Sequence, residues 1–287
     1  MCDQCEVGTK EKIRGGQFAG TEGFPLQKRC ALVIPRPLIF PPMKIQVLAT
    51  ILTLAASSVF AQEKNYAIMP VLHPGTEARH ESFNVISKKG EAQLVFLGDS
   101  ITHGWEGKGK EVWEKYWAPL KAANFGIGGD RTEHVLWRME HGNFDGLKPK
   151  EIVVMIGTNN TGHEGRPQKE LDGAIYHCTA QQTADGVKAI VAKLKEKCPG
   201  AKILLLAIFP RGATPADKAR QQNEETNALI KKLADDKTVF FMDINAKFLE
   251  SDGTLSKDIM PDLLHPNAKG YEIWAEAIAP KVKELLK

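Results

Sequence analysis

The sequence has few cysteines, no long hydrophobic run and little excess of either charge, with a formal net charge of +3. Of its five cysteines, Cys2, Cys5 and Cys30 lie near the N-terminus, and only Cys178 and Cys198 follow. So few cysteines exclude a disulfide-dense scaffold. The Cys2/Cys5 pair has no second pair or histidine cluster beside it and is a weak metal or redox signal. No His-Glu-x-x-His motif, cysteine–histidine cluster or calcium-binding loop occurs, so we expect neither a metal nor a cofactor.

We expect Cys178 and Cys198 to stay unpaired, because they bracket a segment with helical spacing, about Tyr176–Lys197. Twenty helical residues would separate them by roughly 30 Å. A disulfide requires Cα atoms within about 7 Å.

Charge is balanced over most of the chain. Residues 1–61 carry seven of the 38 basic and four of the 35 acidic residues, which leaves 31 of each sign from residue 62 onward. A nucleic-acid-binding protein needs a clustered basic surface, and none is visible, so we expect no nucleic-acid partner. The content of 43% hydrophobic and 25% charged residues is typical of a soluble globular protein.

A leader pattern accounts for the uneven N-terminus. Met43 and Lys44 precede an apolar run, Ile45–Ala56, and small residues ending at Ala61. This pattern predicts a signal peptide over 43–61, cleaved before Gln62, and a secreted or periplasmic protein. An uncleaved anchor is the alternative, but the run is short of the roughly 20 residues that span a bilayer. We read residues 1–42 as an over-extended or disordered N-terminus, and 62–287 as one domain without stable membrane insertion.

Hydrophobic periodicity in that domain predicts an α/β fold: a doubly wound, flavodoxin-like sheet of five parallel strands with helices on both faces. The strands are apolar, β-branched runs, two of them apolar on both faces, as buried parallel strands are. A short leading arm, Glu63–Lys89, precedes them. The expected strands are Gln93–Leu97, Ala122–Phe125, Glu151–Ile156, Lys202–Phe209 and Thr238–Ile244. The expected helices are Glu111–Trp117, Arg131–His141, Tyr176–Lys197, Pro215–Ala234 and Asn267–Leu286.

Compact polar segments follow the first three strands and precede the last helix. They are Gly98–His103, Gly126–Arg131, Gly157–Asn160 and Asp262–Pro266. Ligands of open α/β sheets bind at the carboxyl ends of the strands. The four segments together supply a hydroxyl, a histidine, an acid and amide donors, which are the groups that nucleophilic acyl transfer requires.

These four blocks, in this order, resemble the SGNH (GDSL) hydrolase family over about Gln93 to Leu286. The stretch from Asn124 through Arg138 is similar to the catalytic subunits of type Ib platelet-activating-factor acetylhydrolases. The resemblance implies a serine esterase. The apparent signal peptide is a departure from those subunits.

Ser100 is the expected nucleophile, since it follows a strand directly. His265 is the expected general base, and Asp262, three residues earlier, can fix its tautomer. A helix-capping serine and a surface turn are the alternatives if the blocks are taken singly. The other seven histidines have no such partner spacing and are expected to be structural or surface groups.

The expected oxyanion hole uses the Ser100 N–H and, as the resemblance implies, the Gly129 N–H and the Asn159 side-chain amide. A dinucleotide-binding reading of the glycine run does not fit, because Arg131 occupies the position of its last glycine. Asp99 and Asp130 are expected to hold turns and caps.

Residues beside the reacting groups are expected to wall a small acyl pocket: Ile101, Thr158 and Leu264. An acetyl ester is therefore expected, with O-acetylated carbohydrate as the substrate. Alternatives are a short-acyl phospholipid, a lysophospholipase or thioesterase activity, and a non-catalytic carbohydrate-binding module. Arg166 or Arg211 could meet an anionic or sugar group, although a solvated loop arginine is the simpler interpretation. A homodimer is possible.

Overall fold

The computed structural model describes residues 64–287. The expected signal peptide over 43–61 and the residues before it lie outside this part of the chain. Among the described helices, none is long and apolar enough to cross a membrane.

Five parallel strands form one sheet in the order β2-β1-β3-β4-β5, which confirms the predicted fold. β1 lies beside β2 and β3 in a register that aligns Gly98 with Gly126 and Met155, so these three strands end level. The polar segments that follow them therefore meet at one rim. The strands are β1 (Leu94–Gly98), β2 (Ala122–Gly126), β3 (Glu151–Met155), β4 (Lys202–Leu206) and β5 (Val239–Met242).

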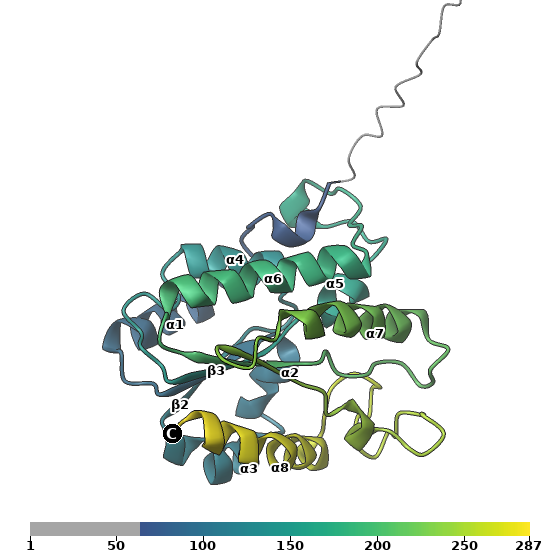
Figure 1. The fold of residues 1–287 in the computed structure, drawn as a ribbon. Coiled ribbons are helices and arrows are strands. Elements are labelled where there is room, and N and C mark those ends of the chain that lie inside the picture. The colour runs from purple at the N-terminus through teal and green to yellow at the C-terminus, as the bar shows by residue number, and fades with distance from the viewer. Residues whose placement is uncertain (1–63) are drawn as a thin grey trace, which may run out of the picture. The chain divides into compact units, whose positions relative to one another are not determined.

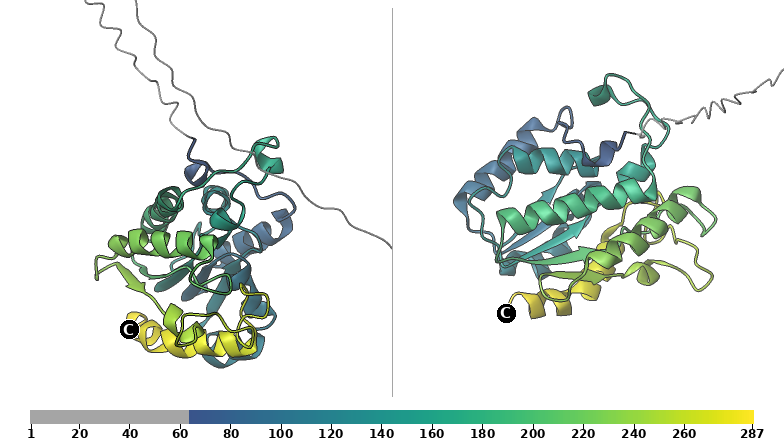
Figure 2. Two further views of the ribbon diagram at one scale, coloured as in Figure 1. Left: turned by 90° about the vertical axis from the view of Figure 1, so that its right-hand side faces the viewer. Right: turned by 45° about the horizontal axis from the view of Figure 1, so that its top comes forward.

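Helices cover both faces of the sheet (Figures 1 and 2). One face carries α1 (Glu77–Lys89), α4 (Thr132–Glu140), α5 (Thr158–Gly162), α6 (Ala180–Lys197) and α7 (Lys218–Ile230). The other carries α2 (Ser100–His103), α3 (Lys110–Tyr116) and α8 (Ala268–Leu285). Short 3₁₀ turns are η1 (Tyr66–Ile68), η2 (Gly104–Glu106), η3 (Ala118–Leu120), η4 (Lys169–Leu171), η5 (Lys231–Leu233) and η6 (Asn245–Phe248).

Successive side chains of each strand point to opposite faces of the sheet, so the apolar residues around the sheet form two clusters. In β1, Val95 and Leu97 pack under α1, α4 and α6, whereas Leu94 and Phe96 pack under α3 and α8. The ring of Phe96 lies 5.1 Å from that of Trp117 and 6.2 Å from that of Trp274. Complete burial of one large apolar side chain contributes about 1.5–3 kcal/mol, so both faces stabilise the sheet substantially.

The leading arm contains a helix that the sequence pattern did not reveal. α1 ends at Gly90, whose φ of 67° is the left-handed conformation that stops helices. The buried residues of α1 are three polar ones, His80, Asn84 and Ser87, and a single apolar one, Phe83. A helix that buries mainly polar groups has no clear hydrophobic periodicity.

Several predicted boundaries are wrong. α7 is Lys218–Ile230 and not Pro215–Ala234, with Asp217 as its N-cap, and two further differences have their cause in hydrogen bonding. α6 begins at Ala180 and not at Tyr176, because Thr179 and Gln182 form a capping box that fixes its start. β4 ends at Leu206, after which the Ile208 N–H donates to the side chain of Asn227 at 2.7 Å. Cys178 and Cys198 are both free and buried, as predicted.

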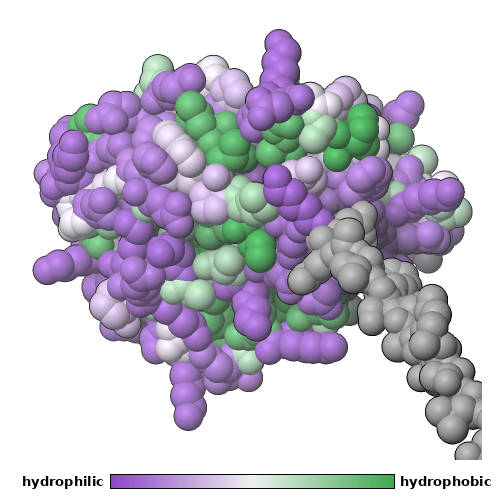
Figure 3. All heavy atoms as spheres, turned by 90° about the horizontal axis from the view of Figure 1, so that it is seen from above, coloured by the Kyte–Doolittle hydropathy of each residue, from purple (hydrophilic) through white to green (hydrophobic). Residues whose placement is uncertain are grey.

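The face above α4 and α6 is mostly hydrophilic, with hydrophobic residues in small separate groups (Figure 3). Four large hydrophobic side chains in the described part are at least 40% exposed: Ile68, Met69, Val85 and Ile175.

Candidate active site

Ser100 lies at the tight turn between β1 and α2. Asp99 caps α2, because its carboxylate accepts a 2.9 Å hydrogen bond from the Ile101 N–H. Complete burial raises the pKa of Asp99 to about 7, although the Ile101 hydrogen bond acts in the opposite direction. The Asp99 side chain therefore holds the turn from inside the protein, as the capping interpretation predicts.

Ser100, His265 and Asp262 form one chain of hydrogen bonds. Ser100 Oγ lies 2.8 Å from His265 Nε2. On the other side of the ring, His265 Nδ1 lies 2.6 Å from Asp262 Oδ2. The contact between an aspartate and Nδ1 places a proton on Nδ1, so Nε2 is free to accept the proton of the Ser100 hydroxyl.

The side chain of Asp262 fixes the turn from Asp262 to His265 by hydrogen bonds to the backbone. Asp262 Oδ1 accepts the N–H of His265 at 2.7 Å and that of Leu264 at 3.1 Å. Partial burial acts to raise the pKa of Asp262, but these bonds and the His265 ring outweigh it, so the pKa lies below its usual value. An ionised carboxylate is the form that orients the imidazole.

Leu263 has the left-handed conformation with φ 60°, which is strained for a branched side chain. Two hydrogen bonds hold Leu263 in this conformation. Its N–H donates to the Met260 carbonyl at 2.8 Å, and its carbonyl accepts from the Gly212 N–H at 3.0 Å. The loop after β4 thus helps hold the histidine turn.

The second block brings Gly128 beside Ser100, with Gly129 as the next residue. A Cβ atom on Gly128 would lie 3.8 Å from the Cβ atom of Ser100. Gly129 has φ 82°, a conformation that glycine adopts without the strain that a side chain would bring.

The third block is linked to the second by Asn159. Its side-chain Nδ2 donates a 3.0 Å hydrogen bond to the backbone carbonyl of Asp130. One amide proton is therefore engaged, which fixes the amide plane and leaves the other proton available. The two expected donors after Ser100 are thus held together through Asp130.

The expected acyl-pocket residues differ in exposure. Ile101 has no exposed surface and packs in the core, and Thr158 is 1% exposed, so neither side chain presents surface to a ligand. Leu264 is half-buried and is the one of the three that can form a wall. The side chains of Ile101 and Thr158 are covered by the protein itself, so a role for these two residues in the acyl pocket stays a prediction.

The two arginines considered for substrate contact also differ in exposure. Arg166 is exposed. Arg211 is half-buried and donates to the carbonyl and hydroxyl oxygens of Thr158, at 2.6 and 3.1 Å. Arg211 therefore braces the third block.

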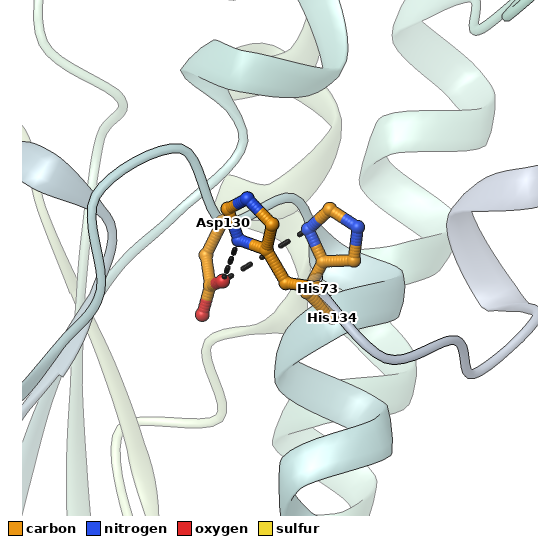
Figure 4. Close-up of side chains that lie close together, drawn as sticks. All are labelled: His73, Asp130 and His134. Carbon is orange, nitrogen blue, oxygen red and sulfur yellow. Dashed lines mark hydrogen bonds and ion pairs between the residues drawn. The ribbon is translucent and has the colours of Figure 1, made fainter. Parts of the chain in front are cut away.

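Two histidines that the sequence predicts to be structural or surface groups lie near Asp130. His73, from the leading arm, and His134, from α4, stack with ring centroids 4.5 Å apart, and both approach Asp130 (Figure 4). Nothing in the sequence indicates this pairing, because 57 positions separate His73 from Asp130.

Three such side chains can in principle hold a cation, since one ligand atom of each lies within 4.8 Å of the others. His134 Nδ1, however, already accepts the Arg131 N–H at 3.0 Å. Arg138 also places a guanidinium nitrogen 2.9 Å from the Asp130 carboxylate. An occupied lone pair and an adjacent cation both oppose metal binding. We therefore interpret the group as a hydrogen-bonded His73–Asp130 pair with the ring of His134 stacked on His73.

A cavity of about 1050 Å³ lies along the outer edge of β2, between α1 and α3, where Phe83, Trp113 and Asn124 line it. None of the triad residues contributes to its wall.

Comparison with known proteins defines the class. Residues 96–273 match the GDSL-like lipase/acylhydrolase family, and the chain belongs to that family. It is therefore an acylhydrolase, a carboxylic ester hydrolase that acts on small-molecule esters.

Individual proteins are similar to the chain over most of its length. The chain is 38% identical over 208 residues to human platelet-activating factor acetylhydrolase IB subunit alpha1, which covers 72% of this chain and 82% of that one. It is also 38% identical to the rat alpha2 subunit, over 73% of this chain and 84% of the relative. A GDSL-like lipase of Bacteroides thetaiotaomicron shares the fold, with a TM-score of 0.57 at 20% identity over 72% of this chain and 97% of the other. An acetylxylan esterase of Geobacillus stearothermophilus does so with a TM-score of 0.53 at 22% identity, over 68% and 96%.

Proposed function

We propose that this protein hydrolyses short-chain esters, above all acetyl esters, through an acyl-enzyme formed on Ser100. The observation that carries the proposal is the hydrogen-bonded chain from Ser100 Oγ through the His265 ring to Asp262. In this mechanism His265 takes the hydroxyl proton as Ser100 attacks the ester carbonyl, and then returns that proton to the departing alcohol. Water, activated by the same histidine, releases the acid and restores Ser100.

The negative charge on the tetrahedral intermediate requires donors that are already in place. We assign the N–H groups of Ser100 and Gly129 and the free amide proton of Asn159 to this role. Two observations support the assignment: Gly128, the residue before Gly129, lies close to Ser100, and Asn159 is bonded to Asp130, the residue after Gly129.

For the acyl group, acetyl is the proposal that two observations support. The relatives at 38% identity are named acetylhydrolases. Leu264 is half-buried and lies directly before His265, a position from which it would restrict the space beside the reacting carbon. We propose O-acetylated carbohydrate as the substrate class, because the domain carries no net charge and is expected to be exported, and because one protein of this fold is an acetylxylan esterase.

A short-acyl phospholipid is the second candidate. It is favoured by the similarity to platelet-activating factor acetylhydrolase subunits. The two candidates share the acetyl group and differ only in the alcohol, so the same triad serves either one.

The test is hydrolysis of p-nitrophenyl esters of two to twelve carbons, followed by acetylated xylo-oligosaccharides and acetylated phospholipid. Ser100→Ala and His265→Ala are each expected to lower kcat by about 10⁴-fold or more while the fold is retained. A fluorophosphonate probe is expected to label Ser100. A folded Ser100→Ala that keeps a tenth of wild-type activity would refute the mechanism and favour a non-catalytic binding module. A preference for chains of eight or more carbons would indicate a lysophospholipase or thioesterase.

We also propose export to the periplasm or the medium, supported by the leader pattern from Met43 to Ala61. Expression from Met43 in a bacterial host is expected to yield an exported protein that begins at Gln62. N-terminal sequencing decides this, and an intracellular product that retains Met43 would contradict it.

A further inference from the structure

Asp130 lies between the two oxyanion donors that follow Ser100. It follows Gly129 directly in the chain, so its position limits where the Gly129 backbone can lie. Its carbonyl also accepts the Asn159 amide at 3.0 Å. Any movement of Asp130 would therefore displace both donors together.

His73 holds Asp130 from outside the sheet. Its Nδ1 lies 2.9 Å from Asp130 Oδ1 and acts as the donor, because the carboxylate can only accept. The ring is packed between Gly129 and the ring of His134: a Cβ atom on Gly129 would lie 2.9 Å from His73 Cε1. His73 thus fixes Asp130 by a hydrogen bond and closes one side of Gly129 by contact.

Arg138 and His134 also contact the His73–Asp130 pair and stabilise it. Arg138, itself buried, lies 2.9 Å from the other carboxylate oxygen of Asp130 and balances its charge. Burial is the main cause that lowers the pKa of His134, so its ring is the neutral form that stacks well on His73. Asp130 is fully buried, whereas His73 retains 24% of its side-chain surface.

We propose that His73 and Asp130 act as a positioning pair that keeps the Gly129 N–H and the Asn159 amide aimed at the developing oxyanion. This rests on the proposed esterase mechanism. It makes the leading arm, through His73, a part of the active site. Misplacement of a donor weakens stabilisation of the transition state and leaves ground-state binding intact, because the oxyanion exists only after attack.

The test uses three substitutions at His73 in the full-length protein, assayed with p-nitrophenyl acetate. His73→Ala removes the donor and is expected to lower kcat by about 10- to 100-fold with KM within about threefold of wild type. His73→Asn places an amide N–H where Nδ1 stands and is expected to restore most of kcat. His73→Gln places its amide one bond further along and is not expected to restore it. His177→Ala is the matched control, because His177 is exposed and pairs only with Glu164.

Thermal unfolding of each variant accompanies the kinetics. If His73→Ala does not fold, the comparison of Asn with Gln carries the test. Wild-type kcat in folded His73→Ala, a loss confined to KM, or equal rescue by Asn and Gln would each overturn the positioning role. So would a loss of activity in EDTA that Zn²⁺ reverses, which would make the cluster a metal site.

The two proposals fail differently. An inactive wild type, or a fully active Ser100→Ala, overturns both. An active enzyme that depends on Ser100 but tolerates His73→Ala overturns only the positioning pair.

Discussion

The Tyr271 hydroxyl, in the last helix, donates a 2.6 Å hydrogen bond to the carbonyl oxygen of Ile101, the residue after Ser100. Helix α8 begins just after the turn that carries His265, with Asn267 as its N-cap. The bond therefore joins α8, which follows the histidine turn, to α2, which carries Ser100, across 170 positions of sequence.

Tyr271→Phe is expected to lower the free energy of unfolding by about 1–3 kcal/mol, because it leaves the buried Ile101 carbonyl without a partner. A smaller fall in kcat is expected, since Ser100 remains on its strand. Chemical denaturation measures the stability. Tyr116→Phe is the control, because Tyr116 is half-buried at the end of α3. Unchanged stability in Tyr271→Phe would show that the bond contributes little.

Asn159→Ala is expected to lower kcat by about 10²–10³-fold with little change in KM, because the amide acts on the intermediate and not on the bound ester. Steady-state kinetics with an acetyl ester measures both constants. The neighbouring Asn160 offers the contrast: it is buried in contacts with Thr132 and Tyr176, so Asn160→Ala is expected to lower the Tm. A rise in KM at constant kcat in Asn159→Ala would make Asn159 a ground-state binder.

Leu264→Ala is expected to widen the acyl site. The relative rate on butyryl and longer esters should rise, while acetyl turnover falls slightly, because a pocket discriminates by about 1–3 kcal/mol per methylene. The ratio of kcat/KM across chain lengths is the measurement. Ile101→Val, at a fully buried position, should instead cost about 0.5–1.5 kcal/mol of stability and leave the chain-length profile unchanged. The same profile in Leu264→Ala as in wild type would place the wall elsewhere.

Glu151 predicts a dependence of stability on pH that is separate from catalysis. It starts β3, has no exposed surface, and neither carboxylate oxygen has a hydrogen-bond partner. Burial raises the pKa of Glu151 to about 9, although the charge of Lys281 acts in the opposite direction. The folded protein thus retains a proton that the unfolded chain loses near its usual pKa of about 4.3. This contribution to stability is complete below that value and is lost as pH rises toward 9.

Glu151→Gln removes this ionisation and is expected to raise the Tm by a few degrees at pH 8, with little change at pH 5. Scanning calorimetry at both pH values measures the difference. Glu111→Gln, at an exposed position of α3, is the control. Equal shifts of the Tm at the two pH values would contradict a buried, protonated Glu151.

Much of this protein could be read from local pattern. The continuous apolar runs, such as Ile152–Ile156, indicate strands buried on both faces, and Ser100 and Asn159 follow strands directly. His265 follows Asp262 by three positions, a spacing that lets the carboxylate reach the near ring nitrogen. The sequence therefore determined the five strands of the sheet, the helices other than α1 and the short α2 and α5, and the residues expected to react.

The tertiary structure decided what depends on contacts between distant segments. No periodicity or spacing in the sequence predicts three of these features. They are the approach of His73 to Asp130, the burial of Ile101 and Thr158, and the hydrogen bond from Tyr271 to the turn that carries Ser100. α1 escaped prediction because it buries polar side chains against the loop near His141 and Asn143. Periodicity records which face of an element is apolar, whereas the partner of a buried polar group is fixed only when the chain has folded.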